Sequence, residues 1–335
     1  MKFEVTGTQQ LQAWADNVMP PVEKVRPGLW SIPVPMPNSS LRYVLVYALE
    51  LPDGVAIIDA GWNTEEAWDA LTGGLGEAGY SITDVKAVLV THIHPDHYGL
   101  AGRVREASGA WVALHPADAA ALGPRYDSPE GLLASMRGFL AGCGVPVDDL
   151  EDLNMASMGV RQFVTQAHPD VLLEDGDRAD LPGWDLRAVW TPGHSPGHLC
   201  FVEPDRRVLL SGDHVLPRIS PNISIHTQQT ANPLADFMDA LVKVAALEVD
   251  EVLPAHEYRF RGLGDRVTQL LGHHEDRLRE VEDILRRQPG SSAWEVTRHM
   301  TWSRSWEEIQ GYMKRSALGE AMAHLVVLEA RGRVR

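Results

Sequence analysis

Three histidines and one aspartate lie within six consecutive residues of the segment Thr91-His92-Ile93-His94-Pro95-Asp96-His97. The apolar run Ala87-Val88-Leu89-Val90 precedes this segment and predicts a buried strand that ends where the histidines begin. Imidazole and carboxylate are ligands that a borderline metal such as Zn²⁺ prefers, and a strand end can direct several of them to one point. By the two-residue period of a strand, the first two histidines share one face, whereas the aspartate and the third histidine follow the bend. The segment therefore predicts a metal site with room for two ions.

Three later loops have the same character. Each follows a short aliphatic run and carries a histidine or aspartate beside Gly or Pro. The loops are Thr191–His198, Ser211–His214 and Ala255–Glu257, which follow the predicted strands Leu186–Trp190, Arg207–Leu210 and Glu251–Pro254. We expect these loops to supply further ligands.

The order of these motifs resembles the metallo-β-lactamase superfamily, and within it the dinuclear hydrolases related to glyoxalase II, over about residues 28–258. The resemblance implies an α/β (α+β) fold, a four-layer αββα sandwich. It implies one metal held by His92, His94 and His194, and a second held by Asp96, His97 and His256, with Asp213 as the bridge. Asp96 would also be catalytic, because it would orient the attacking hydroxide. Two divalent ions per chain are expected, with Zn²⁺ as the default and Fe or Mn as alternatives.

Four other residues are expected around the metals. The resemblance implies that Asp59, at the end of an earlier strand, orients a ligand histidine, while a simple turn-forming role stays open. His214, Arg218 and Asn222 follow the bridging aspartate closely and are expected to line the pocket.

The remaining histidines near motifs or in helices receive structural roles. We expect His198 to support the site by packing, and His115 to cap a helix or form a pocket wall. The pair His273-His274 lies in a charged helical stretch and is expected on a solvated face.

The composition is that of an ordinary globular enzyme, with 44% hydrophobic and 23% charged residues in 335. No apolar run has the length of a membrane span, and the first residues lack the apolar region of a signal peptide. Cys143 and Cys200 are expected to be buried or half-buried thiols, which fits a reducing compartment. We therefore expect a cytoplasmic protein without a membrane partner, and a homodimer stays open.

The charge is unevenly distributed along the chain. Residues 1–256 carry 16 basic and 34 acidic residues, a formal charge of −18, whereas residues 257–335 carry 14 basic and 12 acidic residues. Because nucleic-acid binding is largely electrostatic, the acidic part weakens a nuclease interpretation and makes nucleic acid an unexpected partner.

The pattern predicts a catalytic domain over residues 1–260 and a small helical domain, similar to a winged helix, over residues 261–335. In the first, predicted strands cover Leu29–Val34, Leu41–Leu51, Val55–Asp59 and Trp111–Leu114, and predicted helices cover Gln9–Val18, Thr64–Ala78, Gly99–Ala107, Pro116–Leu122 and Asn232–Leu247. In the second, predicted helices cover Arg266–Arg287, a segment that begins at Trp294, Ser305–Met313 and Leu318–Ala330.

Residues 124–168 exceed what the sandwich needs and predict a helical insertion that covers the pocket as a lid. Gly131–Ala141 reads as a helix, Pro146–Leu153 as an acid-rich turn, and Asn154–Gln166 as a short helix or loop. The apolar ceiling would come from Leu132, Leu133, Met136, Phe139, Leu140 and Met158. A peripheral helical hairpin with its own core is the alternative.

Three functions are compatible with these motifs. The favoured one is hydrolysis of an ester, thioester or lactone of a small to medium substrate by a metal-bridged hydroxide. The second is phosphodiester or RNA cleavage, against which the charge balance counts. The third is a non-hydrolytic metal-binding or redox role on the same scaffold.

Overall fold

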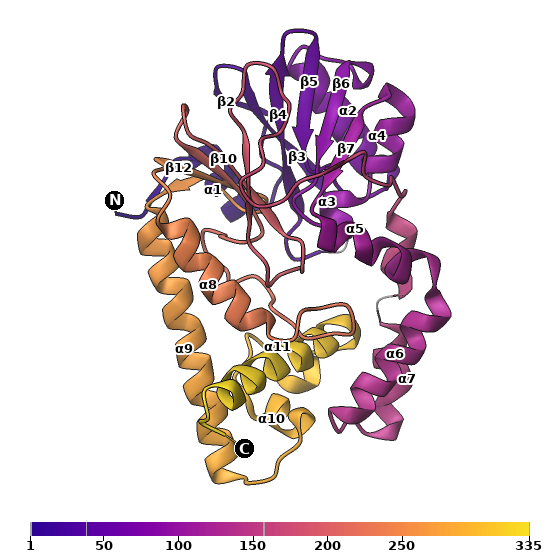
Figure 1. Cartoon of the computed structure of the whole chain (residues 1–335), viewed down its shortest axis with the longest axis vertical. Helices are drawn as coiled ribbons and strands as arrows, with labels where there is room; N and C mark the ends of the chain where they lie inside the picture. The colour runs from indigo at the N-terminus through magenta and orange to yellow at the C-terminus, as the bar shows by residue number, and fades with distance from the viewer. Residues whose placement is uncertain (1, 38, 157, 335) are drawn as a thin grey trace.

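Two β-sheets packed face to face form the centre of the molecule (Figure 1). The computed structural model describes residues 2–37, 39–156 and 158–334. Within them, one sheet has the strand order β2-β3-β4-β5-β6-β7-β8 and the other has the order β1-β13-β12-β11-β10-β9. The predicted sandwich is thus confirmed.

The strands are short and mostly buried. In the first sheet they are β2 (Glu23–Arg26), β3 (Leu29–Pro35), β4 (Tyr43–Leu51), β5 (Gly54–Ile58), β6 (Val85–Leu89), β7 (Trp111–Leu114) and β8 (Val171–Leu172). In the second they are β1 (Glu4–Val5), β9 (Arg187–Trp190), β10 (Leu199–Glu203), β11 (Val208–Gly212), β12 (Glu251–Pro254) and β13 (Phe260–Arg261).

The side chains of β4 point alternately to its two faces, and both faces are buried, which explains why its sequence is almost continuously apolar. Leu45, Tyr47 and Leu49 face the core between the sheets, where they meet residues of β10, β11 and β12 such as Phe201 and Leu210. Their neighbours along the strand face the helices on the outside of the sheet. A strand buried on both faces requires apolar residues at both sets of positions.

Helices cover both outer faces and complete the four layers. They are α1 (Thr8–Asp16), α2 (Glu65–Glu77), α3 (Pro95–Tyr98), α4 (Ala101–Ser108), α5 (Pro116–Leu122), α6 (Pro129–Gly142), α7 (Val147–Met155), α8 (Pro233–Ala245), α9 (Leu263–Arg287), α10 (Ala293–His299) and α11 (Gly311–Ala330). Short helical turns occur at Ile82–Asp84, Gly123–Asp127, Met158–Phe163 and Trp306–Glu308. Helices α2 and α4 pack on the first sheet, and α8 and α9 pack on the second. None of the described helices has the length and apolar character needed to cross a membrane.

Two of the predicted segments were wrong. The acid-rich turn at Pro146–Leu153 is the helix α7, because Asp148 and Asp149 stand in its first turn, where acids favour a helix, and its Leu150 and Leu153 are buried. The helix predicted at Ser305–Met313 is instead the short turn Trp306–Glu308 followed by the start of α11, whereas the helix predicted at Leu318–Ala330 is confirmed as the greater part of α11.

The C-terminal segment is helical, as predicted, but no strand occurs in the described residues 262–334. The β-hairpin of a winged helix therefore has no counterpart there. Helices α9 and α11 instead bury Leu270, Leu278 and Val327 in the same cluster as Phe237 of α8 and Val252 of β12. The C-terminal helices thus share a core with the second sheet.

The insertion packs against the C-terminal helices. Met136 and Leu140 of α6 and Leu153 of α7 are buried in one cluster with Trp294 of α10 and Leu318 of α11. Figure 1 shows these helices on the same side of the sandwich. Two segments that are far apart in the sequence therefore form one cover.

We expect Leu318→Ala to loosen this cover. Leu318 is fully buried, and truncation of a core leucine costs about 2–5 kcal/mol. Denaturant unfolding should show this loss, and hydrogen exchange should accelerate in α6 and α7. The exposed Leu172→Ala is the matched control, with an expected change of at most about 0.5 kcal/mol. Unchanged exchange in α6 and α7 would show that the insertion is held independently of α11.

Candidate metal centre

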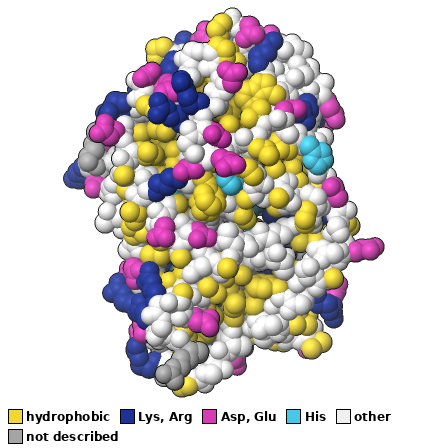
Figure 2. All heavy atoms as spheres, in the orientation of Figure 1, with side chains coloured by type: hydrophobic (Ala, Val, Ile, Leu, Met, Phe, Trp, Pro, Cys, Tyr) yellow, Lys and Arg dark blue, Asp and Glu magenta, His cyan; other side chains and the backbone are white. Residues whose placement is uncertain are grey.

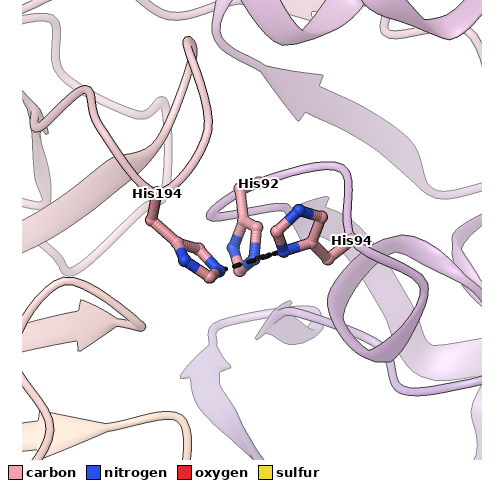
Figure 3. Close-up of side chains that lie close together, drawn as sticks. All are labelled: His92, His94 and His194. Carbon is pink, nitrogen blue, oxygen red and sulfur yellow. Dashed lines mark hydrogen bonds between the residues drawn. The ribbon is translucent and has the colours of Figure 1, made fainter. Parts of the chain in front are cut away.

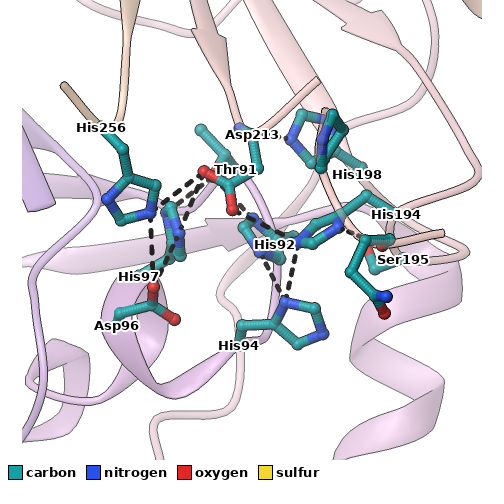
Figure 4. A network of polar contacts seen from close by, with 12 residues as sticks. Thr91, His92, His94, Asp96, His97, His194, Ser195, His198, Asp213 and His256 are labelled. Atoms are coloured by element: carbon teal, nitrogen blue, oxygen red, sulfur yellow. Dashed lines mark hydrogen bonds and ion pairs between the residues drawn. The ribbon is translucent and has the colours of Figure 1, made fainter. Parts of the chain in front are cut away.

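The seven predicted ligand side chains meet at one edge of the sandwich (Figure 4). They come from the loops after β6, β9, β11 and β12, so both sheets contribute. Three groups of ligand atoms lie within 4.8 Å of one another: His92, His94 and His194; His92, His97 and Asp213; and Asp96, His97 and His256. The structure therefore brings all seven together.

The first group consists of three imidazoles that point at one another (Figure 3). His94 Nδ1 lies 2.9 Å from His92 Nε2 and 3.0 Å from His194 Nε2. Burial, together with the imidazoles of His97 and His94, holds the pKa of His92 well below its usual value. A neutral ring with a free lone pair is the form that binds a metal.

The other two groups contain one carboxylate each, Asp213 and Asp96. Asp96 Oδ2 lies 3.5 Å from His97 Nε2 and 3.4 Å from His256 Nε2. Asp213 faces a histidine of each of the two other groups, since its Oδ1 lies 3.2 Å from His256 Nε2 and its Oδ2 lies 3.4 Å from His194 Nε2. This carboxylate therefore has the placement of a bridging ligand.

The other ring nitrogen of each of four histidines is held by the protein. His97 Nδ1 lies 2.7 Å from Asp59 Oδ2, and His92 Nδ1 lies 3.0 Å from Thr91 Oγ1. His194 Nδ1 donates to the carbonyl of Asn222 at 2.9 Å, and His256 Nδ1 donates to the carbonyl of Tyr43 at 2.8 Å. Such partners fix the ring orientation and leave Nε2 directed at the centre.

Asp59 adopts an unusual backbone conformation, with φ of 63° in the left-handed region. This conformation costs energy for a residue with a side chain and is often found at functional positions. Its carboxylate accepts from the Thr91 amide at 2.8 Å and contacts His97. The orienting role expected for Asp59 is therefore the one that its contacts support.

The donor set fits divalent cations. His97 Nε2, Asp213 Oδ1 and His256 Nε2 are buried atoms without a hydrogen-bond partner among the described residues. Burial opposes charge on His256, yet Asp213 and Asp96 raise its pKa to about 10. Burial also opposes the charged form of Asp96 and by itself would raise its pKa, but His97 and His256 outweigh this effect and lower the pKa of Asp96. The buried carboxylates thus favour positive charge at this point, which metal ions supply.

Asp118 is an organising residue that the sequence analysis missed. It is fully buried in α5 and accepts from the Ile93 amide at 3.0 Å, from Ser195 Oγ at 2.9 Å and from the Gly197 amide at 2.7 Å. A Cβ at Gly197 would lie 2.5 Å from the Asp118 backbone nitrogen, so only glycine fits there. The only signal for Asp118 in the sequence is an acidic residue at the start of a helix that follows a strand. This pattern is common in proteins that have no such site.

His198 supports the centre, as expected, without facing it. It is buried, its Nδ1 lies 2.8 Å from Thr191 Oγ1, and its Nε2 accepts from the Asp213 amide at 3.1 Å. Gly212 has φ of 49°, and a Cβ there would approach His198 Nε2 to 2.7 Å. The absence of a side chain at Gly212 therefore allows the His198 ring to contact the Asp213 amide.

Two of the residues expected to line the pocket do not. His214 is fully buried and packs against Phe237, with ring centroids 4.9 Å apart, because the turn after Gly212 directs it into the second sheet's outer core. Arg218 is drawn to the buried Glu257, with Nη2 2.9 Å from Oε1, and turns away from the centre. Asn222 does line the cavity.

The other histidines are placed as follows. His115 accepts from the Ala117 amide at 3.1 Å, so it caps α5 as predicted. His273 is exposed as expected, but for His274 the prediction was wrong, because its ring is buried beside His324 with centroids 5.5 Å apart. Both cysteines are buried, as predicted.

A cavity of about 440 Å³ opens beside the ligands. Asp96, His94, His194 and Asp213 form its floor. The insertion contributes Leu132, Met136 and Phe139, as predicted for a ceiling, while Leu133, Leu140 and Met158 do not line it. Leu140 lies in the core beneath. Tyr312, Met313, Arg315 and Ser316 of α11 also line the cavity, which the sequence analysis did not anticipate.

Asp59→Ala should weaken metal binding about 10–100-fold, because loss of an orienting partner frees the His97 ring. A competition titration with a chromogenic chelator measures this affinity. Asp53→Ala, in an exposed turn, is the control and should bind metal as the unaltered chain does. Equal affinity of both variants would reduce Asp59 to a turn residue.

Comparison with known proteins agrees with this geometry. The family model of the metallo-beta-lactamase superfamily matches residues 40–256. A metallo-beta-lactamase family protein of Thermus thermophilus has 32% sequence identity and a TM-score of 0.80, with 92% of this chain and 95% of that chain covered. A beta-lactamase domain protein of Burkholderia ambifaria has 29% identity and a TM-score of 0.75, with 93% and 88% covered.

Curated relatives include proteins of bacteria and fungi. The probable metallo-hydrolase YqjP of Bacillus subtilis is 24% identical over 313 residues, which are 90% of this chain and 92% of that protein. The lactamase-like protein vrtG of Penicillium aethiopicum is 33% identical over 157 residues, so that this match spans about half of the relative, 47%. On the matched motifs, sheets and ligand loops, this chain belongs to the metallo-beta-lactamase superfamily.

Proposed function

We propose that this protein is a dinuclear metal-dependent hydrolase that cleaves an ester, thioester or lactone bond in a small to medium substrate. The observation that carries the proposal is Asp213, whose two oxygens face the two ligand groups from between them. This placement supports the dinuclear hydrolase branch related to glyoxalase II. Family membership supports a metal-dependent hydrolase in general.

Two divalent ions at such a site supply a nucleophilic hydroxide near neutral pH and polarise the oxygen under attack. The protein's part is orientation. Asp96 borders the cavity, and an ionised carboxylate is able to accept a hydrogen bond from the attacking oxygen, so Asp96 is placed to hold that oxygen towards the substrate. Zn²⁺ suits the histidine and aspartate donors, and Fe or Mn suits them as well.

The surroundings favour a small substrate over a nucleic acid. The cavity is bounded by the insertion and α11, and its apolar side chains suit an acyl group. On the face drawn in Figure 2, basic side chains stand in small groups among acidic ones and form no continuous basic surface. With a net charge of −16, the chain as a whole repels a phosphate backbone.

Metal reconstitution should saturate at about two ions per chain, measured by elemental analysis after gel filtration. Asp213→Ala should lose metal and activity, because removal of the carboxylate between two neighbouring cations leaves their mutual repulsion less compensated. Asp96→Ala should keep the ion of the three-histidine group and lose most turnover. Saturation of the unaltered chain at one ion would reject the bridging role.

A panel of thioesters, lactones, aryl esters and bis(p-nitrophenyl) phosphate tests the reaction class on metal-loaded protein. We expect turnover of one or more acyl substrates well above that of the phosphodiester. His194→Ala should abolish it, and His168→Ala, which alters an exposed histidine outside the site, should not. Preferential cleavage of the phosphodiester would replace the proposal with the phosphodiesterase alternative.

A further inference from the structure

We infer that the cavity binds an anionic group of the substrate, a carboxylate or a phosphate, at Arg125, Arg161 and Arg315. The favoured substrates are then acyl compounds that carry a negative charge near the bond to be cleaved. This inference rests on the proposed function and specifies its substrate class.

Three arginines from three separate segments line the same cavity. Arg125 belongs to the turn Gly123–Asp127, Arg161 to the turn Met158–Phe163, and Arg315 to α11. The acidic residues in the lining are Asp96 and Asp213, and both face the metal-binding histidines. With the ligand carboxylates engaged by cations, the remaining charge of the lining is positive.

This positive lining contrasts with the molecule as a whole, whose net charge is −16. Arginine side chains on an acidic protein are commonly paired with a neighbouring acid. In the described residues, no ion pair joins Arg125 or Arg161 to a carboxylate, although both side chains are only partly exposed. A concave site lined by one sign of charge attracts small ions of the opposite sign.

The positions of the guanidinium groups are held by their surroundings. Arg161 donates to the carbonyl of Tyr126, while its buried Nε has no hydrogen-bond partner in the described part of the chain. Arg315 donates to the carbonyl of Leu153 at 3.5 Å. A buried guanidinium donor that is left over is an arrangement that a carboxylate or phosphate oxygen satisfies.

Arg125 and Arg315 also act on His226, another lining residue: burial lowers the pKa of His226 to about 3, and the two arginines contribute to the shift. Arg125 lines the same cavity as the ligands His94 and Asp96, while the apolar side chains of the insertion remain for the uncharged part of the acyl group.

Three thioesters of matched size test the charge requirement on metal-loaded protein. Hexanoyl N-acetylcysteamine is neutral, adipoyl N-acetylcysteamine carries a carboxylate on the acyl part, and the hexanoyl thioester of 3-mercaptopropionate carries it on the thiol part. We expect one charged thioester to exceed the neutral one in kcat/KM by about tenfold or more. The charged thioester that has the higher kcat/KM shows which side of the scissile bond contacts the arginines.

Arg125→Gln, and Arg125→Gln combined with Arg161→Gln, should bring this ratio of kcat/KM close to one. Arg137→Gln is the matched control, because Arg137 lies in the same insertion but is exposed and pairs with Glu151 at 2.9 Å. It should keep the ratio. Arg125→Lys should restore part of it. Circular dichroism and thermal unfolding establish that each variant is folded.

A binding measurement separates this inference from the proposed function. Isothermal titration compares the binding of adipate, hexanoate and inorganic phosphate to metal-loaded protein, and we expect adipate to bind more tightly than hexanoate. The double variant Arg125→Gln/Arg161→Gln should remove that difference and weaken the binding of phosphate, whereas Arg137→Gln should do neither. If neutral and charged thioesters are hydrolysed equally, the proposed function stands and the inference is wrong. If no thioester is hydrolysed but the binding difference is found, the inference stands and the thioester reaction falls. Equal binding of adipate and hexanoate, whatever the activity, overturns the inference.

Discussion

The face-to-face packing of the two sheets is the constraint on which the centre depends. His92, His94, Asp96 and His97 follow a strand of the first sheet, whereas His194, Asp213 and His256 follow strands of the second. No local segment holds the full set, so the ligands meet only because the core between the sheets aligns the strand ends. Asp118 adds a direct connection, since one buried carboxylate holds a loop from each sheet.

The ligands and the sandwich could be predicted from the sequence because both leave a local signal. A strand reads as an aliphatic run, and His or Asp at its end is conspicuous beside Gly and Pro. Supporting residues such as Thr91 and Asp59 lie close to those signals in the chain. Asp118 could not be found in this way, because its role depends on two loops that are distant in sequence and near only in the fold.

The errors have a common physical cause. For His214, Arg218 and His274, proximity in the chain to the site, or a charged neighbourhood, was taken as a guide to direction. Tertiary contacts decided otherwise: Glu257 attracts Arg218, Phe237 covers His214, and His324 meets His274 inside the molecule. The direction of one side chain after a turn depends on partners that a single sequence does not reveal. The contribution of α11 to the cavity was missed for the same reason.

The cluster that joins Leu140, Trp294 and Leu318 has a consequence for how such a chain diversifies. The insertion and the last helix each form part of the wall of the cavity. They contact each other through that cluster and not through the metal-binding residues. A substitution in the tail, far from any ligand, therefore reshapes the space above the metals, while the floor keeps its geometry. Substrate preference can drift in this molecule without disturbance of the chemistry, provided that both parts of this wall change together.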